Sequence, residues 1–187
     1  MPADPDCLAS IVGLDPGTDT LGVGIITFDV RTLWIDHTSA LTLKGSKCRM
    51  DPMMIESHSE RFARINTLGL NILDILRYHR PVAVVCESPF FNSKRPQAFA
   101  ALIEATAMIR QTVWEYDRTI GLDLVDPPSV KQAVGAKGNA GKDDVHKAVL
   151  QIGELNFRGL LPLSSLDEHS IDAIAVAYSK LIEYRQP

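Results

Sequence analysis

Cysteine is scarce in this chain of 187 residues, and long apolar segments are absent. Cys7, Cys48 and Cys86 lie far apart, are odd in number and form no CxxC pair, so we interpret them as reduced thiols of a cytoplasmic protein. No apolar run approaches the ~20 residues needed to span a bilayer, so no membrane partner is expected. The N-terminal segment contains no basic stretch followed by an apolar one, which argues against a signal peptide.

A strong excess of charge of either sign is also absent. The formal net charge is −4 and the isoelectric point is about 5.7, so any surface that binds nucleic acid must be local. Hydrophobic residues make up 45% of the chain and charged residues 22%, which is typical of a globular protein that needs no disulfide or structural metal. We expect a single domain over residues 1–187, with flexible ends at 1–9 and 185–187.

The pattern of apolar residues predicts the element order βββαβαβαα. The expected strands are residues 11–15, 22–29, 32–43, 82–88 and 122–128. The expected helices begin at the capping-box pair Ser57 and Glu60, span 97–116, follow Asp126 briefly, span 142–152, and begin near the pair Ser165 and Glu168. Residues 44–56 are expected to form an exposed loop. This order predicts one α/β domain with a mixed five-stranded sheet, an antiparallel meander plus parallel strands, and helices on both faces.

The helix expected over 97–116 is apolar on more than one face. Its second apolar stripe consists of Ala98, Ala101, Ala105 and Met108. These mostly small residues exceed what packing against one sheet requires. We therefore predict that this stripe, with Phe99 or Trp114 at its margin, forms the interface of a symmetric homodimer.

Three carboxylates lie at the end of, or within, segments that are otherwise apolar. In the stretch IVGLDPGTDTLGVGIITFD, Asp15 ends the first strand, and Glu87 ends the fourth. Asp172 lies in the second turn of the last helix, three residues after His169 and on the same face. Functional crevices of open α/β sheets lie outside the strand ends. If the first and fourth strands are neighbours, the carboxylates of Asp15 and Glu87 face each other, and the last helix brings Asp172 to the same edge.

Carboxylates brought together in a partly buried site repel one another and need a cation unless they are protonated. Their oxygen atoms favour Mg²⁺, with Mn²⁺ able to substitute. Two such ions about 3.5–4 Å apart activate a water molecule and stabilise the leaving oxygen of a phosphodiester. The pattern therefore predicts a two-metal centre for phosphodiester hydrolysis, with Asp15, Glu87 and Asp172 as carboxylate ligands.

Four successive segments resemble the motif regions of the RuvC-type Holliday junction resolvases, which have the RNase H-like fold. They are GLDPGTDTLGVGI, VVCESPFF, PSVKQAVGAKGNAGKDDV and DEHSIDAIAVA, and the resemblance extends over residues 11–178. It implies that Asp15, Glu87 and Asp172 take the places of the family's metal-binding acids, with Asp15 bridging the ions. His169 stands where many members have Asp and some have His, which implies either a further metal ligand or a general base.

The resemblance also implies an activity. It implies a structure-selective endonuclease that, as a homodimer, nicks two opposed strands of a four-way DNA junction and leaves 5′-phosphate and 3′-hydroxyl ends. Phe90 matches a family aromatic residue that stacks on or wedges between bases at the crossover, with Phe91 as the alternative. The glycine-rich segment 129–147 is predicted to contact the DNA backbone, and Lys142 is a candidate for stabilising charge in the transition state. The expected DNA-contacting cations are Lys94, Arg95, Lys131, Lys137, Lys142 and Lys147.

Two other classes of function stay open as alternatives. The segment LDPGTDTLGVGI also resembles the phosphate loop of actin- and sugar-kinase-type ATPases, but that fold needs two such domains and far more chain. A junction-binding protein without nuclease activity would not need acids at all three positions. Taken alone, Asp15 before Pro16 and Gly17 is most often a turn former, and His169 near a helix start is a surface residue. The four segments together favour the catalytic interpretation.

Overall fold

The computed structural model describes residues 5–90 and 96–186. The strands are β1 (Leu8–Asp15), β2 (Thr20–Asp29), β3 (Ile35–Lys44), β4 (Ala83–Glu87) and β5 (Leu122–Val125). The helices are α1 (Pro52–Ser57), α2 (Glu60–His79), α3 (Pro96–Tyr116), α4 (Pro127–Ala133), α5 (Lys142–Gln151) and α6 (Glu168–Arg185). Short 3₁₀ turns occur at Pro5–Cys7, Gly45–Lys47 and Leu163–Ser165.

The strands form the predicted mixed sheet of five strands, in the order β3-β2-β1-β4-β5. β1, β2 and β3 form an antiparallel meander, and β4 and β5 run parallel to β1. The pairing of β1 with β2 begins at Leu8 opposite Asp29, so part of the segment expected to be a flexible end already belongs to the sheet. The neighbouring positions of β1 and β4, on which the predicted acidic site depends, are confirmed.

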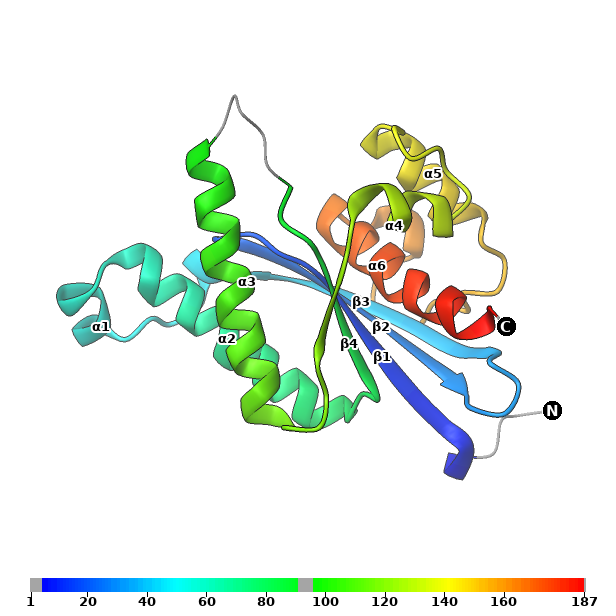
Figure 1. Ribbon diagram of the computed structural model, residues 1–187, viewed down its shortest axis with the longest axis horizontal. Coiled ribbons are helices and arrows are strands. Elements are labelled where there is room, and N and C mark those ends of the chain that lie inside the picture. The colour runs from blue at the N-terminus through cyan, green and yellow to red at the C-terminus, as the bar shows by residue number, and fades with distance from the viewer. Residues whose placement is uncertain (1–4, 91–95, 187) are drawn as a thin grey trace.

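Alternation along the strands divides the core into two layers. Val12 and Leu14 pack with apolar residues of α2 and α3, whereas Ile11 and Val85 pack with those of α4, α5 and α6. Figure 1 shows α2 and α3 on one side of the sheet and α4, α5 and α6 on the other, which confirms the predicted covering of both faces. Within the described ranges, no helix combines the length and hydropathy that crossing a membrane requires.

The segment between β3 and α2 differs from the prediction. Residues 44–56, expected to be a loop, contain most of α1, none of whose residues is buried, so no apolar period marks it in the sequence. Ser57 ends α1 and is not available to cap α2. Ser59 caps α2 instead, and its hydroxyl accepts a hydrogen bond from the amide of Phe62 at 3.3 Å.

The predicted dimer stripe on α3 is partly used inside the chain. Ala105 is buried, and Met108 packs on Gly69 of α2, where a Cβ would lie 3.2 Å from the Met108 sulfur atom. The prediction that Ala105 and Met108 face a second copy is therefore wrong, because the lack of a side chain at Gly69 lets α2 approach this face of α3. A different stripe of α3 is exposed, and it consists of Ala100, Ile103, Ala107 and Trp114.

Candidate active site

The ends of β1 and β4 lie side by side and carry the first two acids. Leu14 pairs with Cys86 in the parallel register, so Asp15 and Glu87 follow at the same edge of the sheet. Side chains alternate along a strand, and Asp15 therefore points to the same face as Ile11, the face that α6 covers. The same alternation directs Glu87 to the face of Val85. The sequence-predicted convergence of these two carboxylates follows from this register.

Glycines on the sheet let α6 lie directly against it. A Cβ at Gly13 of β1 or Gly24 of β2 would collide with the backbone of Ala173 in α6. A Cβ at Gly22, which pairs with Asp15, would collide with the carbonyl oxygen of His169. Glycine in a strand permits this kind of close approach. The three glycines thus bring the first turns of α6 next to the end of β1.

The start of α6 is also tied to β3 by a cluster of polar side chains, which we call the Thr42 cluster. The Thr42 hydroxyl donates a hydrogen bond to Asp167 Oδ1 at 2.6 Å, and its oxygen lies 2.8 Å from the hydroxyl oxygen of Ser170. Asp167, rather than the expected Ser165, caps α6 by accepting the amide hydrogen of Ser170 at 3.0 Å. Because Thr42 pairs with Gly22, the cluster fixes α6 beside the acidic edge.

Electrostatics show that Glu87 and Asp172 share that edge with Asp15. Burial, followed by the charges of Asp15 and Asp172, raises the pKa of Glu87 to about 7. Burial and then the charge of Asp15 raise the pKa of Asp172 to about 6. Burial and the neighbouring carboxylates together disfavour the ionised form of Glu87 and of Asp172, and a bound cation would favour it. The carboxylate donor set therefore fits a hard divalent cation.

These side chains are near one another without forming a closed cage. Over residues 5–90 and 96–186, no three His, Cys, Asp or Glu side chains are grouped tightly enough to enclose a metal ion. Asp15 instead accepts a hydrogen bond from His169, with 2.6 Å between Oδ2 and Nδ1. That bond raises the pKa of His169. Because the carboxylate is the acceptor, the hydrogen belongs to Nδ1, and Nε2 is the nitrogen left to accept a proton or bind a cation when the ring is neutral.

Lys142 lies at the start of α5 and forms an ion pair with Glu168 at the start of α6. The positive charges of Lys142 and Lys131 both oppose the rise in the pKa of Glu87 and of Asp172. The ammonium group of Lys131 donates a hydrogen bond to the carbonyl of Ala140 at 2.8 Å. This contact joins α4 to the glycine-rich loop that leads into α5.

The remaining predicted DNA contacts fall into three groups. Phe90 follows β4 and is 70% exposed, so it is not a core residue. Lys137 and Lys147 are exposed and line a hollow of about 440 Å³ between α5 and the glycine-rich loop that precedes it. Phe91, Lys94 and Arg95 lie outside the described residues.

Two features of the site were not predicted from the sequence. Thr42 contacts α6 only because β3 lies beside Gly22, and an isolated threonine in a strand carries no signal of that contact. The spacing of Gly22 and Gly24 was a usable signal, since glycines two residues apart in a strand place two positions without side chains on one face.

The sequence of this chain is similar to those of known proteins. A family model described as crossover junction endodeoxyribonuclease RuvC matches residues 11–180. The RuvC of Thermus thermophilus is 28% identical over 169 residues, which cover 89% of this chain and 90% of that protein. The RuvC of a Synechococcus species is 30% identical over 169 residues, which cover 89% of this chain and 94% of that protein.

A solved structure has the same fold. Thermus thermophilus RuvC in complex with a Holliday junction substrate matches with a TM-score of 0.67 and 22% identity, covering 94% of this chain and 95% of that one. Nearly the whole of each chain is aligned, so the likeness is one of the overall fold.

Proposed function

Because this chain belongs to the crossover junction endodeoxyribonuclease RuvC family, we propose that it resolves four-way DNA junctions by metal-dependent hydrolysis of a phosphodiester in each of two opposed strands. The observation that carries the proposal is the convergence of Asp15, Glu87, His169 and Asp172 from β1, β4 and α6 at one edge of the sheet. The proposal includes Mg²⁺ as the cation, Mn²⁺ as a substitute, and two ions in each site.

Asp15, Glu87 and Asp172 would hold the ions, and His169 would act through Nε2, either as a further ligand or as the general base. When bound, the ions supply a nucleophilic hydroxide at neutral pH and neutralise charge on the scissile phosphate. Glu87 and Asp172 are both partly buried at this edge. Asp15 orients the His169 ring through the 2.6 Å hydrogen bond, so that the imidazole can take a proton from the attacking water at Nε2.

Lys142 contributes a mobile positive charge at the rim of the site. Its side chain is 69% exposed and its partner Glu168 is 45% exposed, so their ion pair is easily exchanged for a phosphate contact. In the proposal, the ammonium group leaves Glu168 and binds the phosphate as charge develops in the transition state. Lys131, Lys137 and Lys147 contact the DNA backbone, and Phe90 stacks on a base at the crossover.

Paired incision requires two active sites, and we propose a symmetric homodimer through the exposed stripe of α3. Ile103 and Trp114 in this stripe are 47% and 52% exposed, and Ala100 and Ala107 between and beside them allow close approach of a second helix. A twofold axis there places one copy of the acidic edge on each of two opposed DNA strands.

Cleavage of a synthetic four-way junction, compared with linear duplex of the same sequence, tests the proposed function. With Mg²⁺ or Mn²⁺ we expect paired nicks at the junction and none in the duplex, and with chelator we expect no nicks in either. A protein that binds the junction tightly in Mg²⁺ without cutting it would support the alternative of a junction-binding protein. Hydrolysis of ATP in the absence of DNA would support the ATPase alternative.

A further inference from the structure

β5 is an edge strand with backbone groups open to an additional strand. Among residues 5–90 and 96–186, it has β4 on one side and no strand on the other. The carbonyl of Val125 accepts a hydrogen bond from the amide of Ser88, so Val125 and Asp123 direct their backbone groups toward β4. Leu122 and Leu124 therefore direct theirs outward. The Leu124 side chain is 44% exposed beside this open edge.

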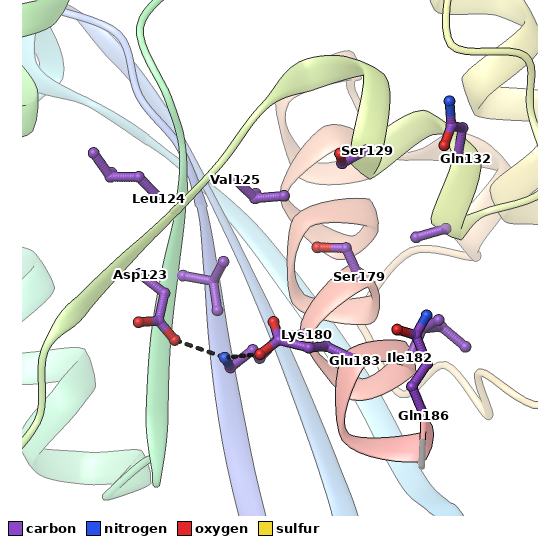
Figure 2. A pocket seen from close by; sticks show the side chains of 12 residues that line it. Asp123, Leu124, Val125, Ser129, Gln132, Ser179, Lys180, Ile182, Glu183 and Gln186 are labelled. Carbon is purple, nitrogen blue, oxygen red and sulfur yellow. Dashed lines mark hydrogen bonds and ion pairs between the residues drawn. The ribbon is translucent and has the colours of Figure 1, made fainter.

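A groove of about 660 Å³ lies beside β5 on the sheet face covered by α4 and α6. Figure 2 shows its walls: Asp123 and Val125 come from β5, Ser129 and Gln132 come from α4, and Lys180 and Glu183 come from the last turns of α6. The groove therefore follows the open strand edge. Side chains of an added strand would alternate between this groove and the opposite face, beside Leu124.

The charge of the groove favours a cationic occupant. The Lys180 ammonium lies 2.9 Å from Asp123 Oδ2 and 2.8 Å from Glu183 Oε1, and its side chain is only 11% exposed. The two carboxylates are more accessible, since their side chains are 49% and 64% exposed. Asp123 and Glu183 thus share a single ammonium group, that of Lys180, so this trio carries one net negative charge. A phosphate would find no free cation among them, whereas a lysine or arginine would find acceptor oxygens.

We propose that this groove and the edge of β5 form a docking site for a protein partner, which binds as an extended segment paired with β5 and places a lysine or arginine side chain against Asp123 and Glu183. Main-chain pairing supplies affinity in such complexes and the pocket for an alternate side chain supplies specificity. Glu183, one of the carboxylates that would bind the cation, lies further along α6 than Asp172 of the proposed active site. Lys180 follows Asp172 by eight residues in α6, or about 12 Å along the helix axis.

Synthetic peptides test the docking site on the full chain. The probe is a six-residue capped peptide of alternating valine and threonine with one central arginine, and matched peptides carry glutamate at that position or N-methyl groups on the pairing amides. We expect the arginine peptide to bind and to shift the NMR signals of Leu124 and Glu183. We expect the glutamate and N-methyl peptides to bind at least about fivefold more weakly, as for loss of charge-assisted or main-chain hydrogen bonds.

Variants locate the binding on the chain. Glu183→Gln, which changes an exposed helical side chain, should weaken the arginine peptide about fivefold while junction cleavage is unchanged. Asp74→Asn on α2, where the side chain is 81% exposed, should leave peptide binding at the wild-type level. Equal binding of the arginine and glutamate peptides, unchanged binding by Glu183→Gln, or displacement of the peptide by duplex DNA would each overturn the proposal.

Discussion

Thr42 in β3 and Asp167 at the start of α6 are joined by a 2.6 Å hydrogen bond, although they are 125 residues apart in the sequence. Asp167 caps α6, and His169 and Asp172 follow it in the first two turns. The bond therefore connects the sheet to the part of the helix that carries half of the proposed metal-binding set. We expect Thr42 to act on the reaction by positioning α6 rather than by touching the substrate.

Replacing Thr42 with valine tests this positioning role. We expect Thr42→Val to lower kcat about tenfold with little change in the affinity for the junction, because misplaced ligands impair the chemical step more than DNA binding. Thr42→Ser keeps the hydroxyl and should restore most of the rate. The matched control is Thr38→Val on the same face of β3. The Thr38 hydroxyl is buried and has no hydrogen-bond partner in the described part of the chain, so its removal should be neutral or stabilising. Equal rate losses in Thr42→Val and Thr38→Val would argue against a specific role for Thr42.

Gly22 provides a test of the contact between β2 and α6. A Cβ at this position collides with the backbone of His169, so Gly22→Ala must push α6 away from the sheet. We expect the free energy of unfolding to fall by roughly 2 kcal/mol, within the range for overpacked cores, and cleavage to be lost. Gly121→Ala is the control, since a Cβ at Gly121 would have no neighbouring atom within 4 Å and the φ angle there is not positive. Urea unfolding of both variants measures the difference, and wild-type stability in Gly22→Ala would contradict the described packing.

The raised pKa values of Glu87 and Asp172 make the stability of the metal-free protein depend on pH. Folding raises both pKa values, so their contribution to stability is fully present below about pH 4 and is lost as pH rises through about 6 for Asp172 and about 7 for Glu87. In metal-free protein near pH 8, Glu87→Gln should therefore increase the free energy of unfolding. One pKa unit corresponds to about 1.4 kcal/mol, and after discounting for solvent screening we expect on the order of 2 kcal/mol.

Thermal unfolding in chelator at about pH 5 and about pH 8 checks this prediction. The advantage of Glu87→Gln over the wild type should be present at the higher pH and nearly absent at the lower one. Mg²⁺ should stabilise the wild type more than the variant, because the cation neutralises the same charge. A variant that is less stable than the wild type at the higher pH would show that the carboxylate is compensated by the protein itself.

Phe90 and Trp34 form a matched pair for testing base stacking. Both side chains are largely exposed, at 70% and 76%, but Phe90 follows β4 at the acidic edge and Trp34 precedes β3 at the opposite end of the sheet. We expect Phe90→Ala to weaken junction distortion and cleavage, with a loss of about 1–3 kcal/mol in junction binding and no change in its salt dependence. Trp34→Ala should leave cleavage unchanged. A 2-aminopurine fluorescence signal at the crossover measures the distortion, and equal effects of the two variants would remove Phe90 from the DNA surface.

The sequence predicted the acids because each follows a local rule. Asp15 and Glu87 end apolar strands that proved to be neighbours, and His169 and Asp172 lie at helical spacing in α6. The approach of α6 to that edge depends on Gly22 and Thr42 and was not predicted in this way. Features that depend on which elements face each other were not predictable in this way. Ala105 and Met108 of the stripe predicted for a dimer pack inside the chain instead, because the sequence does not reveal that Met108 packs on Gly69 of α2.

The sequence also did not identify the N-cap residue of a helix where two capping residues lay close together. Ser57 and Ser59 both precede α2, and the choice of cap was decided by α1, a helix without a buried residue and hence without an apolar period. At α6 the choice between Ser165 and Asp167 was decided by Thr42, which holds the Asp167 carboxylate in place.

Parallel assays of binding and cleavage on one four-way junction test the central claim, that Asp15, Glu87 and Asp172 form the metal centre of a junction-resolving nuclease. We expect Asp15→Asn, Glu87→Gln and Asp172→Asn each to bind the junction within a few-fold of the wild type while producing no nicks in Mg²⁺. Asp143→Asn, which removes an exposed acid from the first turn of α5, should bind and cut at least as well as the wild type. Wild-type nicking by any one of the three acid variants would remove that acid from the centre, and nicking by all three would contradict the account.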